Sequence, residues 1–312
     1  MRKIIVFGAL GMTESMQCGH FPKPGEVLAG SGYVTTPGGK GGNQAVCAAR
    51  MGAETFMVGK VGNDHNGRKI TSNLTNHGVS VMNVSVTARA RTGVSMVVNA
   101  GREFCVVYDP GANGVISYEE VRAAIHGLGE HRNIFLTSLS CDFDVTMQAL
   151  ACAKRNRLYT ILNAAPSHEL PDEAYEGLDL LVVNKDNCCL LSGVDPANDD
   201  ACRKALAFFA AKGVRQTVIT LDKRGSVTME GDHLFKVPGY DVDIVDASCG
   251  GDAYVGELAA HLAFDGTVEE AMQYGTAAAA ISIGRAGAQS SLPSWSEVDS
   301  FIKQHGMLGA NA

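Results

Sequence analysis

The sequence predicts an α/β fold in which helices flank one mostly parallel central sheet. Short apolar runs typical of buried strands alternate with segments of helical periodicity. Apolar residues make up 46% of the 312 residues and charged residues 19%, which supplies a large core and excludes a disordered chain. The sequence contains no repeat period, low-complexity tract or long linker. We therefore expect residues 1–312 to form a single domain.

The predicted strands and helices alternate, as crossover connections between parallel strands require. The strand candidates are residues 4–7, 55–58, 133–137, 159–162, 178–183 and 217–221. The helix candidates are residues 43–51, 145–155, 201–212, 253–264 and 268–283. A strand over residues 4–7, ending in a turn at Gly8, explains the apolar N-terminal stretch better than a secretory leader, because no small-residue cleavage site follows it.

Two stretches break this alternation. Residues 26–36, and residues 93–99 with 103–108, look like strands joined by short turns, the second turn lying around residues 100–102. No helical segment separates these strands. We interpret them as a small β appendage, with its strands within about residues 14–37 and 92–109, that acts as a lid over a site on the main sheet.

Composition excludes several classes of partner. The chain carries 33 acidic and 26 basic residues, and this formal charge of −7 argues against a nucleic-acid surface. It has no apolar run long enough to predict a membrane span. Nine cysteines without a C-x-x-C pair indicate buried thiols in a reducing cytoplasm rather than a zinc or redox site.

The segment V-D-A-S-C-G-G-D-A-Y at residues 245–254 is the strongest sign of chemistry. We predict a strand over residues 239–245, a glycine-rich turn, and a helix from about Ala253. Unpaired N–H groups at a helix start attract an anion, and Gly250 and Gly251 allow its close approach. Asp252 is placed to take a proton from a hydroxyl that attacks a phosphoryl group. A simple helix cap explains the same residues equally well.

A second glycine-rich segment, P-G-G-K-G-G-N-Q-A at residues 37–45, also leads into a helix. Its glycine N–H groups and the ammonium of Lys40 can contact a polar ligand. It does not match the G-x-x-x-x-G-K-[ST] phosphate loop, and no G-x-G-x-x-G follows a strand, so dinucleotide binding has little support.

Together the two segments resemble the two signatures of the ribokinase-like (PfkB) carbohydrate kinases. The N-terminal signature corresponds to residues 38–45 and continues through residues 59–64 and Gly67, and the C-terminal one to residues 246–252. Residues 21–26, 163–166, 169–172, 220–221, 224–225 and 287–289 are also similar to ribokinase. The resemblance covers nearly the whole chain in the same order.

The resemblance implies a Rossmann-like α/β sandwich with a β-sheet lid, and transfer of the γ-phosphoryl group of ATP to a sugar hydroxyl. Asp252 would be the general base, and the N–H groups of Cys249, Gly250 and Gly251 would form the anion hole. The implied sugar-binding residues are Gly11, Thr13, Gly39, Lys40, Gly41, Gly42, Asn43, Ser140 and Asp252. The implied nucleotide-binding residues are Asn184, Thr220, Leu221, Asp222, Lys223, Arg224, Gly225, Gly251 and Thr276.

The resemblance also implies two metal ions. A monovalent cation such as K⁺ would be bound, mostly through backbone carbonyls, by Asp246, Ser248, Ser282, Arg285, Gly287 and Ser291. Asn187 would be a weak contact for Mg²⁺, because it replaces the glutamate of the family's N-x-x-E motif and supplies no negative charge.

The chain departs from the family pattern at other ligand positions as well. Thr13 stands where the family usually has a sugar-binding aspartate, with Glu14 as a substitute if the turn shifts by one residue. Gly11 replaces an asparagine and Ser140 a glutamate. In the C-terminal half, Ala247 replaces a threonine. Asp222 replaces a glycine, adding a carboxylate that repels a triphosphate unless Lys223 or Arg224 compensates.

These features predict an ATP-dependent sugar kinase whose specificity is altered from ribose. The alternatives are a weak or inactive pseudokinase that binds a ligand or regulates, and a nucleoside kinase of the same fold. A dinucleotide-dependent oxidoreductase ranks below them for want of its fingerprint. Cys249 is either a reactive thiol at a helix start or an inert small residue. An apolar face formed by Val94, Met96, Val98, Val106 and Tyr108 would suit a homodimer joined through the lid.

Overall fold

The computed structural model describes residues 1–101, 103–130 and 132–309, so the predicted turn around residues 100–102 lies partly outside the described residues. Within these ranges the main sheet has nine strands in the order β13-β12-β11-β10-β9-β8-β1-β4-β5. Each pair of neighbouring strands from β11 to β5 is parallel, whereas β12 is antiparallel to both of its neighbours, β11 and β13. Their bounds are β1 Ile4–Phe7, β4 Thr55–Gly62, β5 Ser80–Thr87, β8 Ile134–Ser138, β9 Tyr159–Asn163, β10 Leu180–Asn184, β11 Gln216–Thr220, β12 Ser226–Glu230 and β13 His233–Val237.

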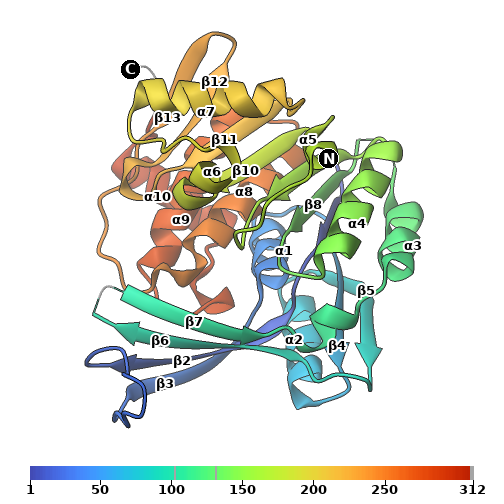
Figure 1. The fold of residues 1–312 in the computed structure, drawn as a ribbon, viewed down its shortest axis with the longest axis vertical. Helices are drawn as coiled ribbons and strands as arrows, with labels where there is room; N and C mark the ends of the chain where they lie inside the picture. The colour runs from blue at the N-terminus through green and yellow to red at the C-terminus, as the bar shows by residue number, and fades with distance from the viewer. Residues whose placement is uncertain (102, 131, 310–312) are drawn as a thin grey trace.

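A smaller sheet, which we call the lid sheet, extends away from the main sheet at the lower left of Figure 1. Its strand order is β3-β2-β6-β7, with β2 and β6 parallel and the two edge strands antiparallel to their neighbours. The bounds are β2 Gly11–Cys18, β3 Ser31–Gly38, β6 Gly93–Ala100 and β7 Glu103–Asp109. The mostly parallel sheet with a small second sheet confirms the predicted fold class.

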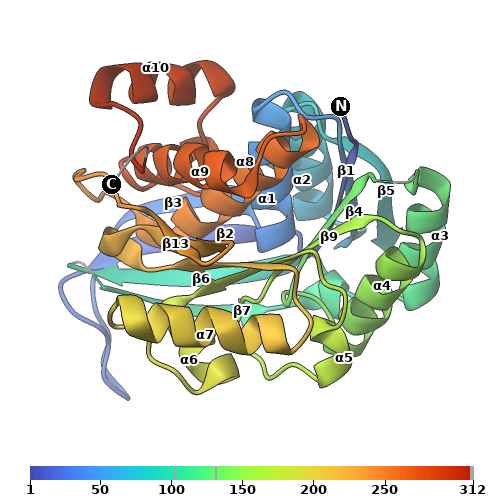
Figure 2. The same cartoon turned by 90° about the horizontal axis from the view of Figure 1, so that it is seen from above.

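Two layers of helices cover the main sheet (Figure 2). Successive side chains of a strand point to opposite faces, so Ile4 and Val6 join one core while Ile5 and Phe7 join the other. The first core is covered by α1 Lys40–Arg50, α2 His65–Asn76, α8 Gly250–Ala263, α9 Val268–Ile283 and α10 Trp295–His305. The second is covered by α3 Tyr118–Leu128, α4 Phe143–Arg155, α5 Asp172–Tyr175, α6 Lys185–Ser192 and α7 Asp199–Ala211.

Several predicted boundaries were wrong, and two of them bear on the site. Both α1 and α8 begin three residues earlier than predicted, so their glycines form the first helical turns instead of preceding loops. Residues 239–245 form no strand, because no neighbouring strand pairs with them and Val245 instead donates its N–H to the carbonyl of Ile283. Residues 26–30 are likewise outside any strand. The first two lid strands begin at Gly11, the start of β2, and end at Gly38, the end of β3.

The sequence predicted that the apolar residues of the lid sheet share one face. The structure contradicts this prediction. The register pairs Val98 with Cys105 and Met96 with Val107, whereas Val106 and Tyr108 alternate with these residues along β7. Val106 and Tyr108 therefore lie on the face opposite to Val94, Met96 and Val98. Both faces of the outer part of this sheet carry exposed apolar side chains.

Among the helices that the structure describes, none combines the length and the apolar character that crossing a membrane needs.

Candidate active site

The two glycine-rich segments meet at Asp252, in the first turn of α8. The Asp252 side chain is 4% exposed. Asn43 Nδ2 donates to its Oδ2 at 2.8 Å, and Gln44 Nε2 donates to its Oδ1 at 3.0 Å. Lys40 Nζ lies 4.0 Å from Oδ1. The carboxylate is therefore held in one orientation, next to a positive charge, by three side chains that sit more than 200 positions earlier in the chain.

Three glycines that were predicted to bind the sugar lie at the start of α1, next to Asn43 and Gln44. Gly39 is the residue before α1, and Gly41 and Gly42 are buried in its first turn. A Cβ atom on Gly41 would lie 2.6 Å from the carbonyl carbon of Gly8, so α1 begins in direct contact with the backbone that follows β1. This contact sets the position of Asn43 and Gln44 relative to the main sheet.

The start of α8 faces open space at Gly251. Within the described residues no side chain caps this helix, and no atom lies within 4 Å of a Cβ built on Gly251. The N–H of Gly250 donates to the carbonyl of Ala247 in the preceding turn Ala247–Cys249, so it is already paired. The positive end of the helix dipole and the Gly251 backbone thus form an anion-attracting surface beside Asp252.

Cys249 is a buried thiol. Its exposed fraction is 1%. Burial, and then the neighbouring carboxylate of Asp252, raise the pKa of the thiol well above its ordinary value. Because the thiolate is the nucleophile, these two features favour the inert alternative over the reactive one.

Thr13 lies on β2 in a neutral environment. It pairs with Thr36 of β3 and Ser95 of β6, so the row of residues across the lid sheet at this level carries hydroxyl groups only. Glu14 is the next residue of the same strand and points to the opposite face. The alternative in which Glu14 replaces the family's aspartate is therefore wrong.

Ser140 and Gly11 lie beside the residues that follow β1. The hydroxyl of Ser140 accepts a hydrogen bond from Ala9 N at 3.1 Å and shares one with Ser138 Oγ at 2.8 Å. Ser140 thus holds the loop between β1 and β2, where a longer acidic side chain would displace it. Gly11 is the first residue of the lid sheet.

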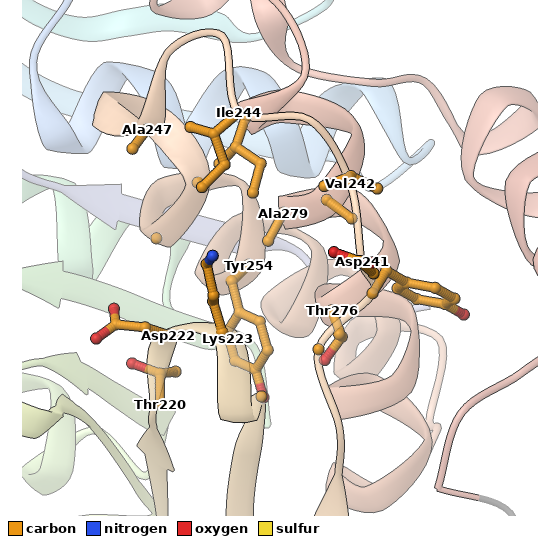
Figure 3. A pocket seen from close by; sticks show the side chains of 17 residues that line it. Thr220, Asp222, Lys223, Asp241, Val242, Ile244, Ala247, Tyr254, Thr276 and Ala279 are labelled. Carbon is orange, nitrogen blue, oxygen red and sulfur yellow. The ribbon is translucent and has the colours of Figure 1, made fainter. Parts of the chain in front are cut away.

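A cavity of about 340 Å³ opens on the other side of the α8 start (Figure 3). Of the predicted nucleotide-binding residues, those that line it are Thr220, Asp222, Lys223, Gly225, Gly251 and Thr276. The residues that complete the wall were not named among the predicted nucleotide-binding residues, and they include Tyr240, Asp241, Val242, Ile244, Ala247, Tyr254 and Ala279. Several of these belong to the stretch misassigned as a strand, whose alternating pattern was the only available signal.

Three predicted nucleotide-binding residues do not line this cavity. Asn184 is exposed and caps α6, its Oδ1 accepting from Asn187 N at 2.7 Å. Leu221 is buried in the second core. The guanidinium of Arg224 donates to the carbonyls of Pro196 and Ala197, each at 2.8 Å.

The backbone explains Asp222. Its φ is +51°, in the left-handed region where glycine is favoured and aspartate is tolerated. In Figure 3 Lys223 reaches across the cavity toward Ile244, while the Asp222 carboxylate points in a different direction. Gly225 closes this turn with φ of +83°, and a Cβ there would lie 1.9 Å from the carbonyl oxygen of Val237. The aspartate therefore fits this loop without distorting it.

The residues predicted to hold a monovalent cation come together next to α8. Asp246 Oδ1 accepts from Ser248 N at 3.0 Å, and its Oδ2 accepts from Gly287 N at 3.2 Å. The hydroxyls of Ser282 and Ser291 are 2.9 Å apart and buried. The guanidinium of Arg285 is directed elsewhere and donates to Glu297 at 2.8 Å. Oxygen donors of this kind suit a hard cation.

Asn187 is not an open metal ligand. It is 2% exposed, and its Oδ1 accepts a hydrogen bond from the hydroxyl of Ser167. Among the described residues, no group of three or more histidine, cysteine or acidic side chains is arranged to hold a metal ion. A divalent ion at this site would depend on oxygen atoms brought by a ligand.

Known proteins are similar to this chain in sequence and in fold. A family model described as "pfkB family carbohydrate kinase" matches residues 1–295. The ribokinase of Haemophilus influenzae is 30% identical over 305 residues, which cover 97% of this chain and 99% of that protein. A deoxyribokinase of Salmonella typhi is 30% identical over 283 residues, covering 90% and 92%. The structure of Arabidopsis thaliana ribokinase complexed with ribose and ATP has a TM-score of 0.85 at 24% identity, covers 97% of this chain and 99% of its own, and shows the same fold.

Proposed function

The chain belongs to the pfkB family of carbohydrate kinases, and on that premise we propose that it transfers the γ-phosphoryl group of ATP to a hydroxyl of a small sugar. It is thus a phosphotransferase. The observation that carries the proposal is the position of Asp252, fixed by Asn43 and Gln44 beside the open start of α8 and next to the cavity lined by Gly251.

Asp252 acts as the general base. Its carboxylate accepts the proton of the sugar hydroxyl as the oxygen attacks the phosphoryl group. The two amide donors keep the carboxylate oriented, and Lys40 keeps positive charge where negative charge develops. The bond between the phosphoryl group and ADP breaks in the cavity as a bond to the sugar oxygen beside Asp252 forms, next to the Gly251 backbone at the start of α8, and ADP leaves.

The nucleotide occupies the cavity, with its phosphates directed to Gly251 and Lys223. Mg²⁺, when bound, neutralises phosphate charge, and it is held chiefly by the phosphates themselves because Asn187 is already bonded to Ser167. K⁺ fits the oxygen-rich loops around Asp246 and Ser282, where its charge supports the anion-binding start of α8.

The acceptor differs from ribose in its hydroxyl pattern. Thr13, Thr36 and Ser95 place neutral hydroxyls at the level of the lid sheet where a carboxylate would accept two sugar hydroxyl hydrogen bonds. The similar proteins carry the names ribokinase and deoxyribokinase, so acceptors of pentose size are the first class to test.

The protein acts as a homodimer in the reducing cytoplasm. The outer part of the lid sheet exposes apolar side chains on both faces, with Val107 73% exposed on one face and Tyr108 58% exposed on the other. All nine cysteines are free thiols. Sedimentation velocity at micromolar concentration tests the dimer, and a monomer throughout would contradict it.

The test of the function is ADP release with Mg-ATP and K⁺ across pentoses, deoxypentoses, hexoses and nucleosides. We expect one sugar class to be phosphorylated, with mass spectrometry identifying a sugar phosphate. A nucleoside as sole substrate would favour the nucleoside kinase. ATP binding with no turnover on any acceptor would favour a regulatory pseudokinase, and absence of ATP binding would refute the kinase assignment.

A further inference from the structure

A buried asparagine joins the lid sheet to the body of the protein. Asn113 lies in the short turn Gly111–Val115 that follows β7, and it is 3% exposed. Its Oδ1 accepts from Leu10 N at 2.8 Å, and its Nδ2 donates to Leu10 O and to Pro110 O, each at 2.8 Å. One side chain thus satisfies three backbone groups where the chain enters β2 and leaves β7.

The strands of the lid sheet that lie next to Asn113 carry no side chains of their own there. Its first row of paired residues consists of Gly38, Gly11 and Gly93, in register on β3, β2 and β6. A Cβ on Gly93 would lie 2.6 Å from Asn113 Nδ2, so the missing side chain makes room for the amide. Asn113 therefore supplies the side-chain contact at a level where the strands themselves have only backbone.

A second contact holds the start of β6. Asp64, at the N-terminus of α2, accepts from Thr92 N at 2.8 Å and from Thr92 Oγ1 at 2.7 Å. Gly62 N in turn donates to Thr92 Oγ1 at 2.9 Å. The Thr92 contacts anchor the start of β6 to β4 and to α2, one residue before the glycine row.

The glycine row is close in the chain to residues that we propose to bind the sugar acceptor. Thr13 lies two residues beyond Gly11 on the same face of β2, and Gly38 lies directly before Gly39, which precedes α1 and Asn43. A small rotation at the glycine row therefore changes the distance between Thr13 and Asp252. Positioning of a reacting hydroxyl within a fraction of an ångström has large effects on rate.

We propose that Asn113 is a positioning residue for the sugar acceptor: by fixing the backbone of Leu10 and Pro110 it sets how the lid sheet holds Thr13 over Asp252. This proposal rests on the proposed function for its kinetic consequence, although its structural consequence can be measured without any substrate.

Hydrogen exchange tests the structural part. In Asn113→Ala, amide exchange in residues 11–18 and 93–100 should rise by about tenfold, as loss of buried hydrogen bonds to this backbone implies. Asn133→Ala is the matched control, because Asn133 is also a buried asparagine whose Oδ1 accepts from Lys3 N and whose Nδ2 donates to Leu128 O, far from the lid sheet. Unchanged exchange in the lid strands of Asn113→Ala, or an equal rise in both variants, would overturn the proposal.

Kinetics tests the positioning part, with the sugar that the wild-type protein phosphorylates fastest. We expect the KM for that sugar to rise about tenfold in Asn113→Ala, while the KM for ATP stays within twofold and Asn133→Ala changes neither. Thr92→Val removes the hydroxyl contacts to Asp64 and to Gly62 N but keeps the bond from Thr92 N to Asp64. It should shift the sugar KM in the same direction and replaces Asn113→Ala if that variant does not fold. Equal effects on both substrates would overturn the proposal. Wild-type protein without turnover would refute the proposed function and leave hydrogen exchange to decide the role of Asn113.

Discussion

The carboxyl group of Glu257 is buried where a negative charge is unfavourable. Replacing Glu257 by a neutral residue should therefore stabilise the protein. It lies on α8, five residues after Asp252, and is 1% exposed. Among the described residues neither of its carboxylate oxygens has a hydrogen-bond partner. The nearest histidine, His261, has its Nδ1 4.0 Å away. Three other titratable groups lie near Glu257 or His261, namely Cys47 on α1 and Glu270 and Tyr274 on α9.

Burial sets the direction of the pH effect. It raises the pKa of Glu257 well above the usual 4.5, and it lowers the pKa of His261, which weakens the histidine as a source of positive charge at neutral pH. The folded protein therefore keeps the Glu257 proton to a higher pH than the unfolded chain does. The resulting stability is fully present below pH 4.5 and is lost as pH rises through the folded-state pKa.

The expected magnitude follows from proton linkage. In Glu257→Gln the site no longer titrates, so the unfolding free energy of the variant should gain on the wild type by up to about 1.4 kcal/mol for each pH unit within that window. For a chain of 312 residues this corresponds to a Tm difference that widens by about 2 °C per pH unit.

Thermal denaturation of both proteins between pH 5.5 and 8.5 measures this difference. Glu173→Gln is the control, because Glu173 is exposed on α5 and its exchange should leave the pH dependence of the wild type unchanged. A Tm difference that is constant with pH, or a variant that becomes less stable as pH rises, would refute the reasoning.

Three further predictions follow from the site. Gly225→Ala should lower stability by about 2–5 kcal/mol, because it puts a Cβ 1.9 Å from a carbonyl oxygen at positive φ; an unchanged Tm would contradict the loop geometry. Iodoacetamide at pH 7 should modify the exposed Cys105 and spare Cys249, as peptide mass spectrometry can show; equal labelling of both would mean that the α8 start is open to the reagent. Thr13→Asp should lower the KM for ribose about tenfold by restoring an acceptor for two sugar hydroxyls, and a KM that stays the same would remove Thr13 from acceptor selection.

Much of the fold was predictable because the buried strands have a simple pattern. The run Ile4–Phe7 is apolar throughout and lies inside the sheet, between β8 and β4. The helix over residues 268–283 has the predicted ends because a threonine cap and a final glycine mark them. The edge strands β5 and β13, and β12 next to β13, were missed, since these strands mix polar and apolar residues without a clear period.

The chemistry of the site was also visible in the motifs, whereas its walls were not. Asp252, Asn43 and Lys40 lie in glycine-rich segments whose composition marks them. By contrast, Asn113 and Tyr240 take their positions from tertiary contacts, namely the hydrogen bonds to Leu10 and the packing around the cavity. No local pattern in the sequence reports contacts between residues so far apart.

Turnover of Asp252→Asn, with the sugar that the wild type phosphorylates, decides whether Asp252 is the general base. The substitution keeps the shape of the side chain but removes the proton acceptor, so kcat should fall by at least about a hundredfold while ATP binding stays within twofold. Asp179→Asn, at a buried aspartate that bonds Thr160 and Arg215 away from the site, should keep a kcat near that of the wild type. Turnover by Asp252→Asn within tenfold of the wild-type rate would contradict the claim that this carboxylate is the general base.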